Sequence, residues 1–505
     1  MKLLKVLIFA LAISGVLCAC GAAPEDKLDA ISVALSDEQI KVDGVVASTD
    51  ASAAVFTAKD IVYYEAGKDF TYGEGSEKDA HGPEQAAEHT VVHITKPGAY
   101  RISGKLSKGQ IAVDLGEDAK KDPNAVVTLI LDGADITCQV APAIIFYNVY
   151  ECADTENPTK DVDTTKAGAN ILLAKGTANT ANGAYVAKIY KPDSVVLNSD
   201  QTAVEDAKKL HKYDGAVYSK MSMNIGGSGK LNINAENEGL DSEMHLTIND
   251  GDINIRSGND GINTNEDNIS VTTVNGGNLA ITVTGETGEG DGIDSNGYLV
   301  INGGTVLAQA CSTSGDAGID SDKGIYINGG TVIATGHMLD RIESGGQTHA
   351  VFNFAQKQQD GSEISLKNKK GTALLEITPE NAYSILIYSS PDLKEGDYTL
   401  YSGNTQLAGS ASAMGGGMRP GGTPPEGFQK PEGQRPEKPE DLPEDFKPPE
   451  GMTPPEGMTP PEGDFHQRPD MPQGGQQPQE GTLTLSEIFK IVKGTNMFSG
   501  IAPKQ

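Results

Sequence analysis

The sequence predicts an all-β chain whose body is a right-handed parallel β-helix, followed by a C-terminal antiparallel β cap and a disordered Pro-rich segment. Glycine makes up 60 of the 505 residues, against an average of about 7% in ordinary chains. These glycines recur in two repeated phrases, and the residues between the phrases alternate between apolar and polar with the period of a half-buried strand. Such repeats cannot bury their apolar faces singly, so we expect neighbouring repeats to stack.

The first phrase is an Asn-Gly or Asp-Gly turn that ends a short β-rich run. Its asparagines are Asn249, Asn275, Asn302 and Asn328, at intervals of 26, 27 and 26 residues. The second phrase reads Asp-Gly-Ile-Asp-Ser or a close variant. It begins at Glu238, Asp260, Asp291 and Ala317, at intervals of 22, 31 and 26 residues. We infer that the first turn is fixed and that the stretches between turns absorb insertions.

The intervals fit a coil of three short strands per repeat, stacked at the sheet spacing of ~4.8 Å. A leucine-rich repeat would need a helical return, which is not visible, and propeller blades of ~40 residues fit the intervals badly. Weaker echoes near Val127–Gly133 and Ile171–Gly176 extend the predicted β-helix to residues 91–345. The stretch 177–213 is predicted to be a loop insertion at one corner.

The N-terminal residues 1–19 are typical of a bacterial lipoprotein signal peptide. Two lysines precede an apolar run that is too short to span a bilayer, and Leu17-Cys-Ala-Cys20 fits the acylation pattern. Cys20 would then carry lipid and anchor the protein to a membrane at the cell surface. An ordinary cleaved secretory signal is the alternative. Residues 20–56 are predicted to be a tether, and residues 57–90 lead-in strands.

The C-terminal part changes in composition. Residues 346–413 read as antiparallel strands of a β cap over the last repeat. Residues 414–481 are rich in Gly, Pro, Glu and Gln, contain four copies of Pro-Pro-Glu-Gly, and are expected to be extended and disordered. Residues 482–505 are a C-terminal strand or tail. The Pro-rich run is therefore either an insertion within the cap or the start of a plain tail.

Charge and cysteine usage restrict the partners. The 70 acidic and 40 basic residues give a formal charge of −30, which argues against nucleic-acid binding and favours cations as small partners.

Beyond the signal and Cys20, three cysteines remain, and an odd number gives no disulfide framework. Cys138 and Cys152 could pair, or serve as small core residues. No zinc spacing, phosphate loop or nucleophile elbow is visible.

Stacking the second phrase in register predicts a column of acidic residues. Asp214, Glu238, Asp260 and Asp291 would form one line, and Asp241, Asn263, Asp294 and Asp320 the next. Carboxylates ~4.8 Å apart repel by about 3 kcal/mol at an effective dielectric of 20, and bound calcium would reverse that sign. The predicted metal ligands are Asp241, Asp260, Asp291, Asp294, Asp316 and Asp320. The alternative is that Asp and Asn tolerate left-handed turns and bind their own backbone.

Several segments together resemble a known family. They are the opening Tyr100–Gly104 and Gly109–Asp114, the Leu131–Ile136 repeat, the Gly-Ile-Asp phrases and the ending Ser389–Leu393. Over roughly residues 90 to 410 the chain resembles the carbohydrate-binding β-helix lipoproteins of plant-degrading anaerobic bacteria, first associated with pectin and cellulose. The resemblance implies a right-handed β-helix similar to calcium-dependent pectate lyases. It also implies binding of calcium and of acidic polysaccharide such as polygalacturonate.

The expected function is calcium-dependent binding of an acidic polysaccharide, with no catalytic residue assigned. The alternatives are a structural or adhesive surface protein without glycan specificity and a calcium-dependent polysaccharide lyase. Lys323, near Asp320, is the only basic residue inside a strong phrase and would be the candidate base. The chain has no Trp, which disfavours stacking on neutral sugars, although Tyr298 and Tyr326 could still stack on a sugar.

Overall fold

The computed structural model describes residues 28–154, 157–412 and 485–504. The predicted signal peptide, Cys20 and the Pro-rich segment lie outside these ranges. The described chain is all-β, as predicted. Its one α-helix within these ranges is α1 (Pro83–Ala87), and two 3-10 helices are η2 (Glu117–Lys121) and η3 (Pro192–Ser194). None of the helices described is long and apolar enough to cross a membrane.

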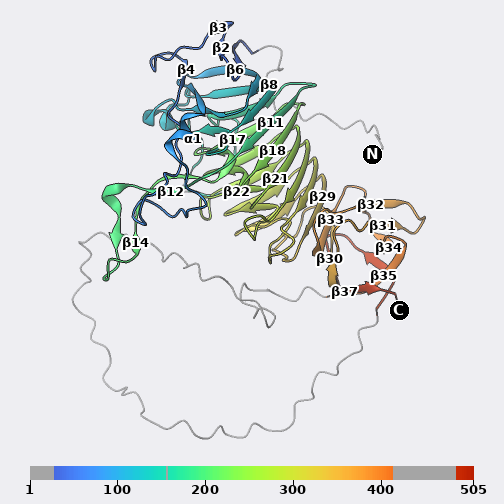
Figure 1. The fold of residues 1–505 in the computed structure, drawn as a ribbon. Helices are drawn as coiled ribbons and strands as arrows, with labels where there is room; N and C mark the ends of the chain where they lie inside the picture. Colours follow the sequence, from blue (N-terminus) through green and yellow to red (C-terminus); the bar gives the residue numbers. More distant parts are fainter. Residues whose placement is uncertain (1–27, 155–156, 413–484, 505) are drawn as a thin grey trace, which may run out of the picture. The chain divides into compact units, whose positions relative to one another are not determined.

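Successive repeats contribute strands to three stacks, and equivalent strands of successive repeats pair in parallel (Figure 1). The first stack contains β8 (Val127–Thr137), β10 (Ala169–Leu173), β17 (Met223–Gly226), β20 (Leu246–Ile248), β23 (Val271–Val274), β26 (Tyr298–Ile301) and β28 (Gly324–Ile327). The second contains the end of β8, β11 (Ala178–Gly183), β18 (Lys230–Ala235), β21 (Asp252–Ser257), β24 (Asn278–Val283), β27 (Thr305–Gln309) and β29 (Thr331–Gly336).

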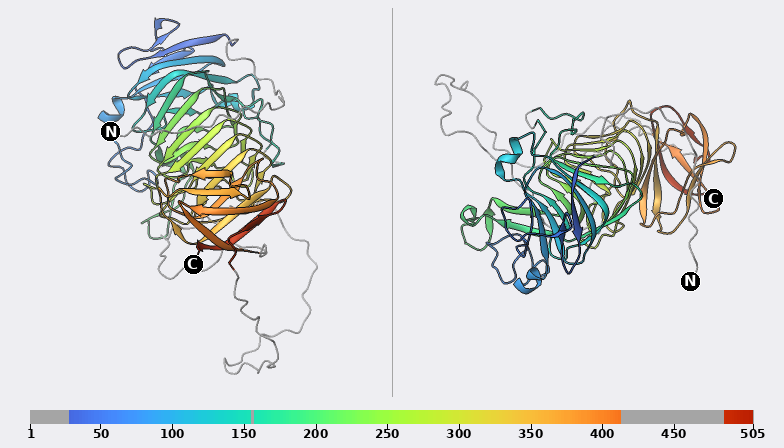
Figure 2. Two further views of the ribbon diagram at one scale, coloured as in Figure 1. Left: turned by 90° about the vertical axis from the view of Figure 1, so that its right-hand side faces the viewer. Right: turned by 90° about the horizontal axis from the view of Figure 1, so that it is seen from above.

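The third stack carries the second phrase of the repeat. It contains β5 (Thr90–Ile94), β7 (Gly109–Val113), β9 (Ile144–Phe146), β16 (Gly215–Ser219), β19 (Glu238–Ser242), β22 (Ile262–Thr264) and β25 (Ile293–Ser295). β4 (Val55–Ala58) closes its first edge by pairing antiparallel with β5. Figure 2 shows the strands of successive repeats lying side by side.

The core consists of aliphatic side chains that meet their equivalents in the next repeat. In the second stack Ile233, Ile255 and Ile281 are in register, and all three are almost fully buried. In the third stack Ile262 and Ile293 are in register and fully buried. This packing explains the alternation in the sequence, because every second residue of a strand faces the same side. It also explains why few aromatic residues are needed in this core.

The Asn-Gly turn forms a ladder of side-chain hydrogen bonds. The Nδ2 group of each asparagine donates to the Oδ1 atom of its equivalent one repeat earlier, over 2.8–2.9 Å, along Asn249, Asn275, Asn302 and Asn328. Gly304 in the same turn has φ +77°, and an added Cβ would lie 2.6 Å from the Gly277 carbonyl oxygen. The turn therefore accepts only glycine at this position, which accounts for the recurrence of glycine in each copy of the phrase.

The prediction that residues 20–56 form a tether is wrong for part of that range. Residues 30–35 form β1 (Ala30–Leu35), which pairs in parallel with β6 (Gly98–Leu106), and β6 pairs in turn with β8. β2 (Lys41–Val42) and β3 (Val45–Val46) follow as short antiparallel strands. Val33 is fully buried. Leu35 is buried as well, but the sequence signal is weak because this single short alternation is flanked by small and polar residues.

The predicted loop insertion begins later than expected. Residues 178–183 form β11 of the second stack, whose inward positions carry small residues and therefore gave no apolar pattern. The inserted segment itself contains β12 (Val186–Tyr190) paired antiparallel with β15 (Lys209–Tyr213). Between them, β13 (Val196–Leu197) pairs antiparallel with β14 (Val204–Asp206).

The C-terminal strands pair mainly antiparallel. They are β30 (His349–Gln358), β31 (Ile364–Asn368), β32 (Ala373–Ile377), β33 (Tyr383–Ser389), β34 (Gly396–Ser402), β35 (Thr405–Ala411), β36 (Phe489–Ile491) and β37 (Thr495–Pro503). β33 pairs antiparallel with β29, the last strand of the second stack. β37 pairs with both β30 and β35. The strands before and after residues 413–484 therefore belong to the same sheets, and Phe352, Phe489 and Phe498 pack together between them.

Candidate functional site

The second phrase of the repeat forms what we call the acidic column. Its members are Glu238, Asp241, Asp260, Asn263, Asp291, Asp294 and Asp320. The strand register places Asp241, Asn263 and Asp294 on successive repeats, as predicted. The backbone N–H of Asp320 donates to the Ile293 carbonyl over 2.7 Å and continues the same register. Four of these seven side chains, Glu238, Asp241, Asn263 and Asp294, lie on strands of the third stack, and the other three lie on adjoining segments.

A glycine at the second position of the phrase lets the column form. A Cβ added to Gly261 would lie 2.1 Å from the Cγ2 atom of Ile281, and one added to Gly292 would lie 2.4 Å from the Gly318 carbonyl oxygen. Any side chain there would therefore collide with the core or with the next repeat. The glycine allows successive repeats to approach closely. The acidic residues on either side of the glycine in each phrase therefore also lie close to their equivalents.

The predicted place of Asp214 in this column is wrong by one residue. Gly215 lies opposite Glu238, and Tyr218 lies opposite Asp241. The segment from Asp214 to Ser219 holds one residue more than the later phrases, so its first residue falls out of register. Asp214 is nevertheless close enough to contribute to the raised pKa of Glu238, after the larger effect of burial.

Three carboxylates meet at the C-terminal end of the column. One oxygen from each of Asp291, Asp294 and Asp320 lies within 4.8 Å of the other two, and we call these residues the carboxylate trio. Among the described residues, no lysine or arginine forms an ion pair with the trio. Burial and then the Asp320 charge raise the pKa of Asp291 to about 9 and of Asp294 to about 7. Burial, followed by Asp340, raises the pKa of Asp320 to about 6.

The other end of the column is more deeply buried. Glu238 Oε2, Asp241 Oδ2 and Asn263 Oδ1 are buried and have no hydrogen-bond partner. Burial, and then the charge of a neighbouring acid, raises the pKa of Glu238 to about 8 and the pKa of Asp241 well above its usual value. Unpartnered buried oxygens are costly in a folded protein. A proton or a bound cation would satisfy the two carboxylate oxygens, and a hydrogen-bond donor or a cation would satisfy the amide oxygen.

A lysine from the insertion partly neutralises this end. The Nζ atom of Lys212, on β15, lies 3.9 Å from Glu243 Oε1. Burial lowers the pKa of Lys212, but the charges of Glu243 and Asp241 outweigh it, so the net pKa is raised. No pattern in the sequence singles out this lysine, because it lies in the insertion outside every repeated phrase.

The predicted ligands Asp241, Asp260 and Asp316 lie outside the trio and accept hydrogen bonds instead, Asp241 from the Asn265 side-chain amide over 2.6 Å. An Asp260 oxygen accepts the Asp291 N–H over 2.6 Å, and an Asp316 oxygen accepts the Gly290 N–H over 2.6 Å. Asp291 also accepts the Ala317 N–H through one oxygen, over 2.5 Å. Asp316 thus binds the backbone of the preceding repeat, whereas the alternative interpretation expected acidic side chains to bind their own backbone. Metal ligation by Asp316 stays a prediction.

Tyrosines lie beside the column and on another part of the body. Tyr213 makes edge contacts with Tyr147 at 5.3 Å and with Tyr218 at 5.1 Å between ring centroids. In its own repeat, Tyr218 occupies the position that Asp241 occupies in the next repeat. This tyrosine was not singled out from the sequence. Tyr298 and Tyr326 lie 6.2 Å apart, with the Lys323 ammonium 5.9 Å from the Tyr298 ring centroid.

The possible disulfide does not form. Cys138 and Cys152 are both free, and Cys138 is buried. Cys138 therefore serves as a small core residue, the other interpretation of its place in the sequence.

Comparison with known proteins identifies the family. The model of a family described as carbohydrate-binding domain-containing protein matches residues 88–410, which include the whole acidic column. The chain belongs to this carbohydrate-binding domain family. A relative of the same description from Acetivibrio thermocellus is 30% identical over 168 residues, covering 33% of this chain and 45% of the relative. The chain thus matches less than half the length of that relative.

The carbohydrate-binding domain chain is also similar to one solved structure. This is a polysaccharide lyase-like protein from C. thermocellum, determined as a gadolinium derivative, with 22% identity and a TM-score of 0.35. The likeness covers 60% of this chain and 89% of the other. At that TM-score the likeness supports no structural argument.

Proposed function

We propose that this carbohydrate-binding domain protein binds acidic polysaccharide in a calcium-dependent manner. Its stacked strands form a right-handed parallel β-helix in this proposal, and lipid on Cys20 holds it at the cell surface. The observation that carries the proposal is the carboxylate trio of Asp291, Asp294 and Asp320, whose oxygens lie within 4.8 Å of one another without a basic partner among the described residues.

The chemistry of the trio fits a hard divalent cation. Calcium takes six to eight oxygen ligands in irregular arrangements, and carboxylates are its preferred protein ligands. Burial, and after it the charge of Asp320, raises the pKa of Asp291 and Asp294, so the ionised trio is unfavourable without a cation. No histidine or cysteine contributes to the trio, which disfavours zinc. The unpartnered oxygens of Glu238 and Asp241 offer the same kind of ligand at the other end of the column.

An acidic sugar is the ligand that such a cation selects. A calcium ion held by three carboxylates keeps free coordination positions, which the carboxylate of a uronate can fill. Without the cation, the acidic column and the net charge of −30 would repel the same ligand. Binding should therefore depend sharply on calcium.

The positions of the lysines favour binding over catalysis. Lys212 is the lysine beside the column, and nearby carboxylates keep its pKa above the usual value, so it holds its proton. Lys323 lies over the ring of Tyr298. A base that removes a sugar proton must be uncharged near neutral pH and within reach of the ligand. Neither lysine meets both conditions.

The test is affinity electrophoresis or a glycan array with polygalacturonate, in calcium and in chelator. We expect binding in calcium and none in chelator. The double variant Asp291→Ala/Asp294→Ala should bind at least about tenfold more weakly, a loss of about 1.4 kcal/mol. The matched control is Asp360→Ala, at an exposed acidic position outside the column, which should bind normally.

Other outcomes would point to the alternatives. Binding that survives chelator would overturn the calcium proposal. Absence of any glycan signal would favour a structural or adhesive surface protein, and release of unsaturated sugar products would show a lyase. Lipid attachment is tested separately by labelled fatty-acid incorporation, which Cys20→Ala should abolish.

A further inference from the structure

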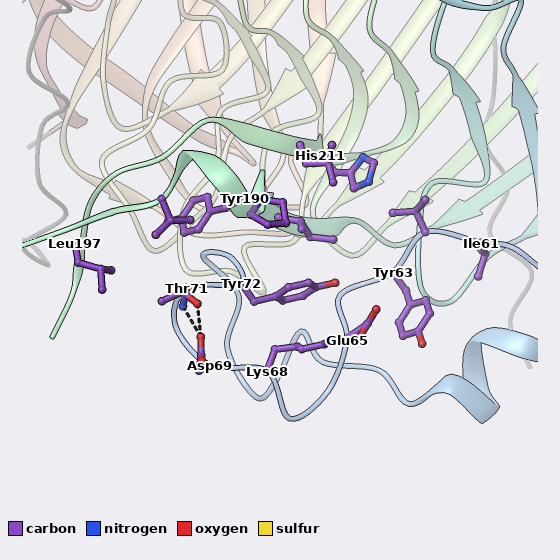
Figure 3. A pocket seen from close by; sticks show the side chains of 15 residues that line it. Ile61, Tyr63, Glu65, Lys68, Asp69, Thr71, Tyr72, Tyr190, Leu197 and His211 are labelled. Atoms are coloured by element: carbon purple, nitrogen blue, oxygen red, sulfur yellow. Dashed lines mark hydrogen bonds and ion pairs between the residues drawn. The ribbon is translucent and has the colours of Figure 1, made fainter. Parts of the chain in front are cut away.

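A cleft outside the stacked strands lies between two segments that are distant in the sequence. One wall comes from residues 61–72, before β5, and the other from residues 189–211 of the insertion. The cleft has a volume of about 710 Å³. Figure 3 shows Tyr72 on one segment and Tyr190 on the other, facing the same space. It is separate from the carboxylate trio, none of whose residues lines it.

The two walls are joined by regular backbone contacts. The Tyr190 N–H donates to the Tyr72 carbonyl and the Glu74 N–H donates to the Lys188 carbonyl, each over 2.8 Å. A Cβ added to Gly73 would lie 2.1 Å from the Lys188 carbonyl oxygen. The segments are therefore closely fitted, and the cleft is a preformed feature.

The lining is mainly aliphatic and aromatic. Ile61, Ile189 and Tyr190 are buried in it, whereas Leu210 at its edge is 46% exposed. The other apolar side chains that line it are Val62, Tyr63, Tyr72, Pro192, Val195 and Leu197. A concave surface of this kind, with few polar groups, is typical of a small-molecule site.

The polar groups of the cleft already have partners within the protein. The Lys68 ammonium pairs with Glu65 over 2.8 Å, and Asp69 accepts the Thr71 N–H over 2.9 Å. The Tyr190 hydroxyl donates to Glu74 over 3.2 Å. His211 contacts the Tyr213 hydroxyl, and burial lowers the pKa of His211 to about 4, so it is uncharged at neutral pH. A ligand is therefore not required to supply a charge.

We propose that this cleft binds an uncharged aromatic group carried by a sugar, as an aryl glycoside or aryl ester. The sugar part of this proposal rests on the proposed carbohydrate-binding function. Three tyrosines and the aliphatic walls match a flat apolar ring, which packs well against aromatic side chains. A bare pyranose fits poorly, because the aliphatic walls would leave its hydroxyl groups without hydrogen bonds. An acidic ligand would meet Glu65 and Asp69.

The test is fluorescence titration of 4-methylumbelliferyl β-glucoside with the full chain in chelator, with glucose as competitor. The aryl glycoside should bind, and excess glucose should not displace it. Tyr72→Ala and Leu210→Asp should each weaken binding by about tenfold. Val196→Asp is the matched control, since Val196 is an exposed apolar residue of the same insertion that does not line the cleft. It should leave the affinity unchanged.

The opposite results would overturn the proposal. These are no binding of the aryl glycoside, full competition by glucose, or equal weakening by Val196→Asp and Leu210→Asp. Near-ultraviolet circular dichroism of the tyrosines establishes that each variant is folded. Neither calcium nor polysaccharide is present in this assay, so its failure would leave the calcium-dependent site standing. Failure of the polygalacturonate test would leave binding of the aromatic group in the cleft standing and would remove only the argument for its sugar.

Discussion

Replacing Asp294 by Asn should change stability in opposite directions with and without calcium. In the carboxylate trio, Asp294 lies near Asp291 and Asp320, and burial followed by the Asp320 charge raises its pKa from 3.8 to about 7. Asn keeps the size of the side chain and one oxygen but removes the charge. Without a cation this removes repulsion, whereas with calcium it removes a ligand charge.

The magnitude follows from the shift in pKa. Because the folded-state pKa lies above the unfolded value, the carboxyl group contributes stability below pH 3.8 that is lost as the pH rises through about 7. A shift of roughly three pKa units corresponds to about 4 kcal/mol. Since the shift combines the burial of the charge with repulsion shared among three carboxylates, we expect the variant to gain about 2 kcal/mol in chelator at pH 8. The native protein in chelator should also be more stable at pH 5 than at pH 8.

The assay is thermal unfolding at pH 8 in chelator and in saturating calcium, with Asp360→Asn as the control. The native protein should gain about 2.7 kcal/mol at a calcium concentration of 100 Kd. The variant should melt higher than the native protein in chelator and gain less from calcium. Two results would refute this reasoning: a lower melting temperature for the variant in chelator, or equal stabilisation of both proteins by calcium.

Two substitutions test the repeat architecture, and one deletion tests the Pro-rich segment. Asn302→Ala removes two hydrogen bonds of the asparagine ladder and should cost about 1–2 kcal/mol, measured by urea unfolding; an unchanged midpoint would show that the ladder does not stabilise the turn. Ile281→Ala opens a cavity at a fully buried position and should cost about 2–5 kcal/mol, with a loss below that range arguing against tight packing. Deleting residues 414–481 and joining Ala413 to Thr482 by a short Gly/Ser turn should leave the melting temperature nearly unchanged, because this composition cannot offset its ordering entropy. A large loss of stability would contradict the prediction that this segment is extended and disordered.

The sequence by itself predicted the all-β chain and most of the acidic column. The register of Asp241, Asn263 and Asp294 was visible because equivalent residues recur at each repeat and adjacent repeats contact one another directly. The glycine of each turn was visible for the same reason. Where one residue was added, at Asp214, the same reasoning placed the residue one position out of register.

Only the tertiary structure decided which acidic residues gather and what faces them. The trio consists of Asp291, Asp294 and Asp320, whereas Asp316 binds a backbone N–H. The direction of each side chain sets this difference, and the spacing of residues in the sequence does not reveal that direction. Lys212 reaches the column from the insertion.

The cleft arises in the same way, since its walls at residues 61–72 and 189–211 are more than 100 residues apart. Contacts between neighbouring repeats produce a periodic pattern in the sequence, because each repeat packs against the next with the same kinds of residues at the same positions. Contacts made once, between distant segments, leave no period, so only the folded chain reveals them.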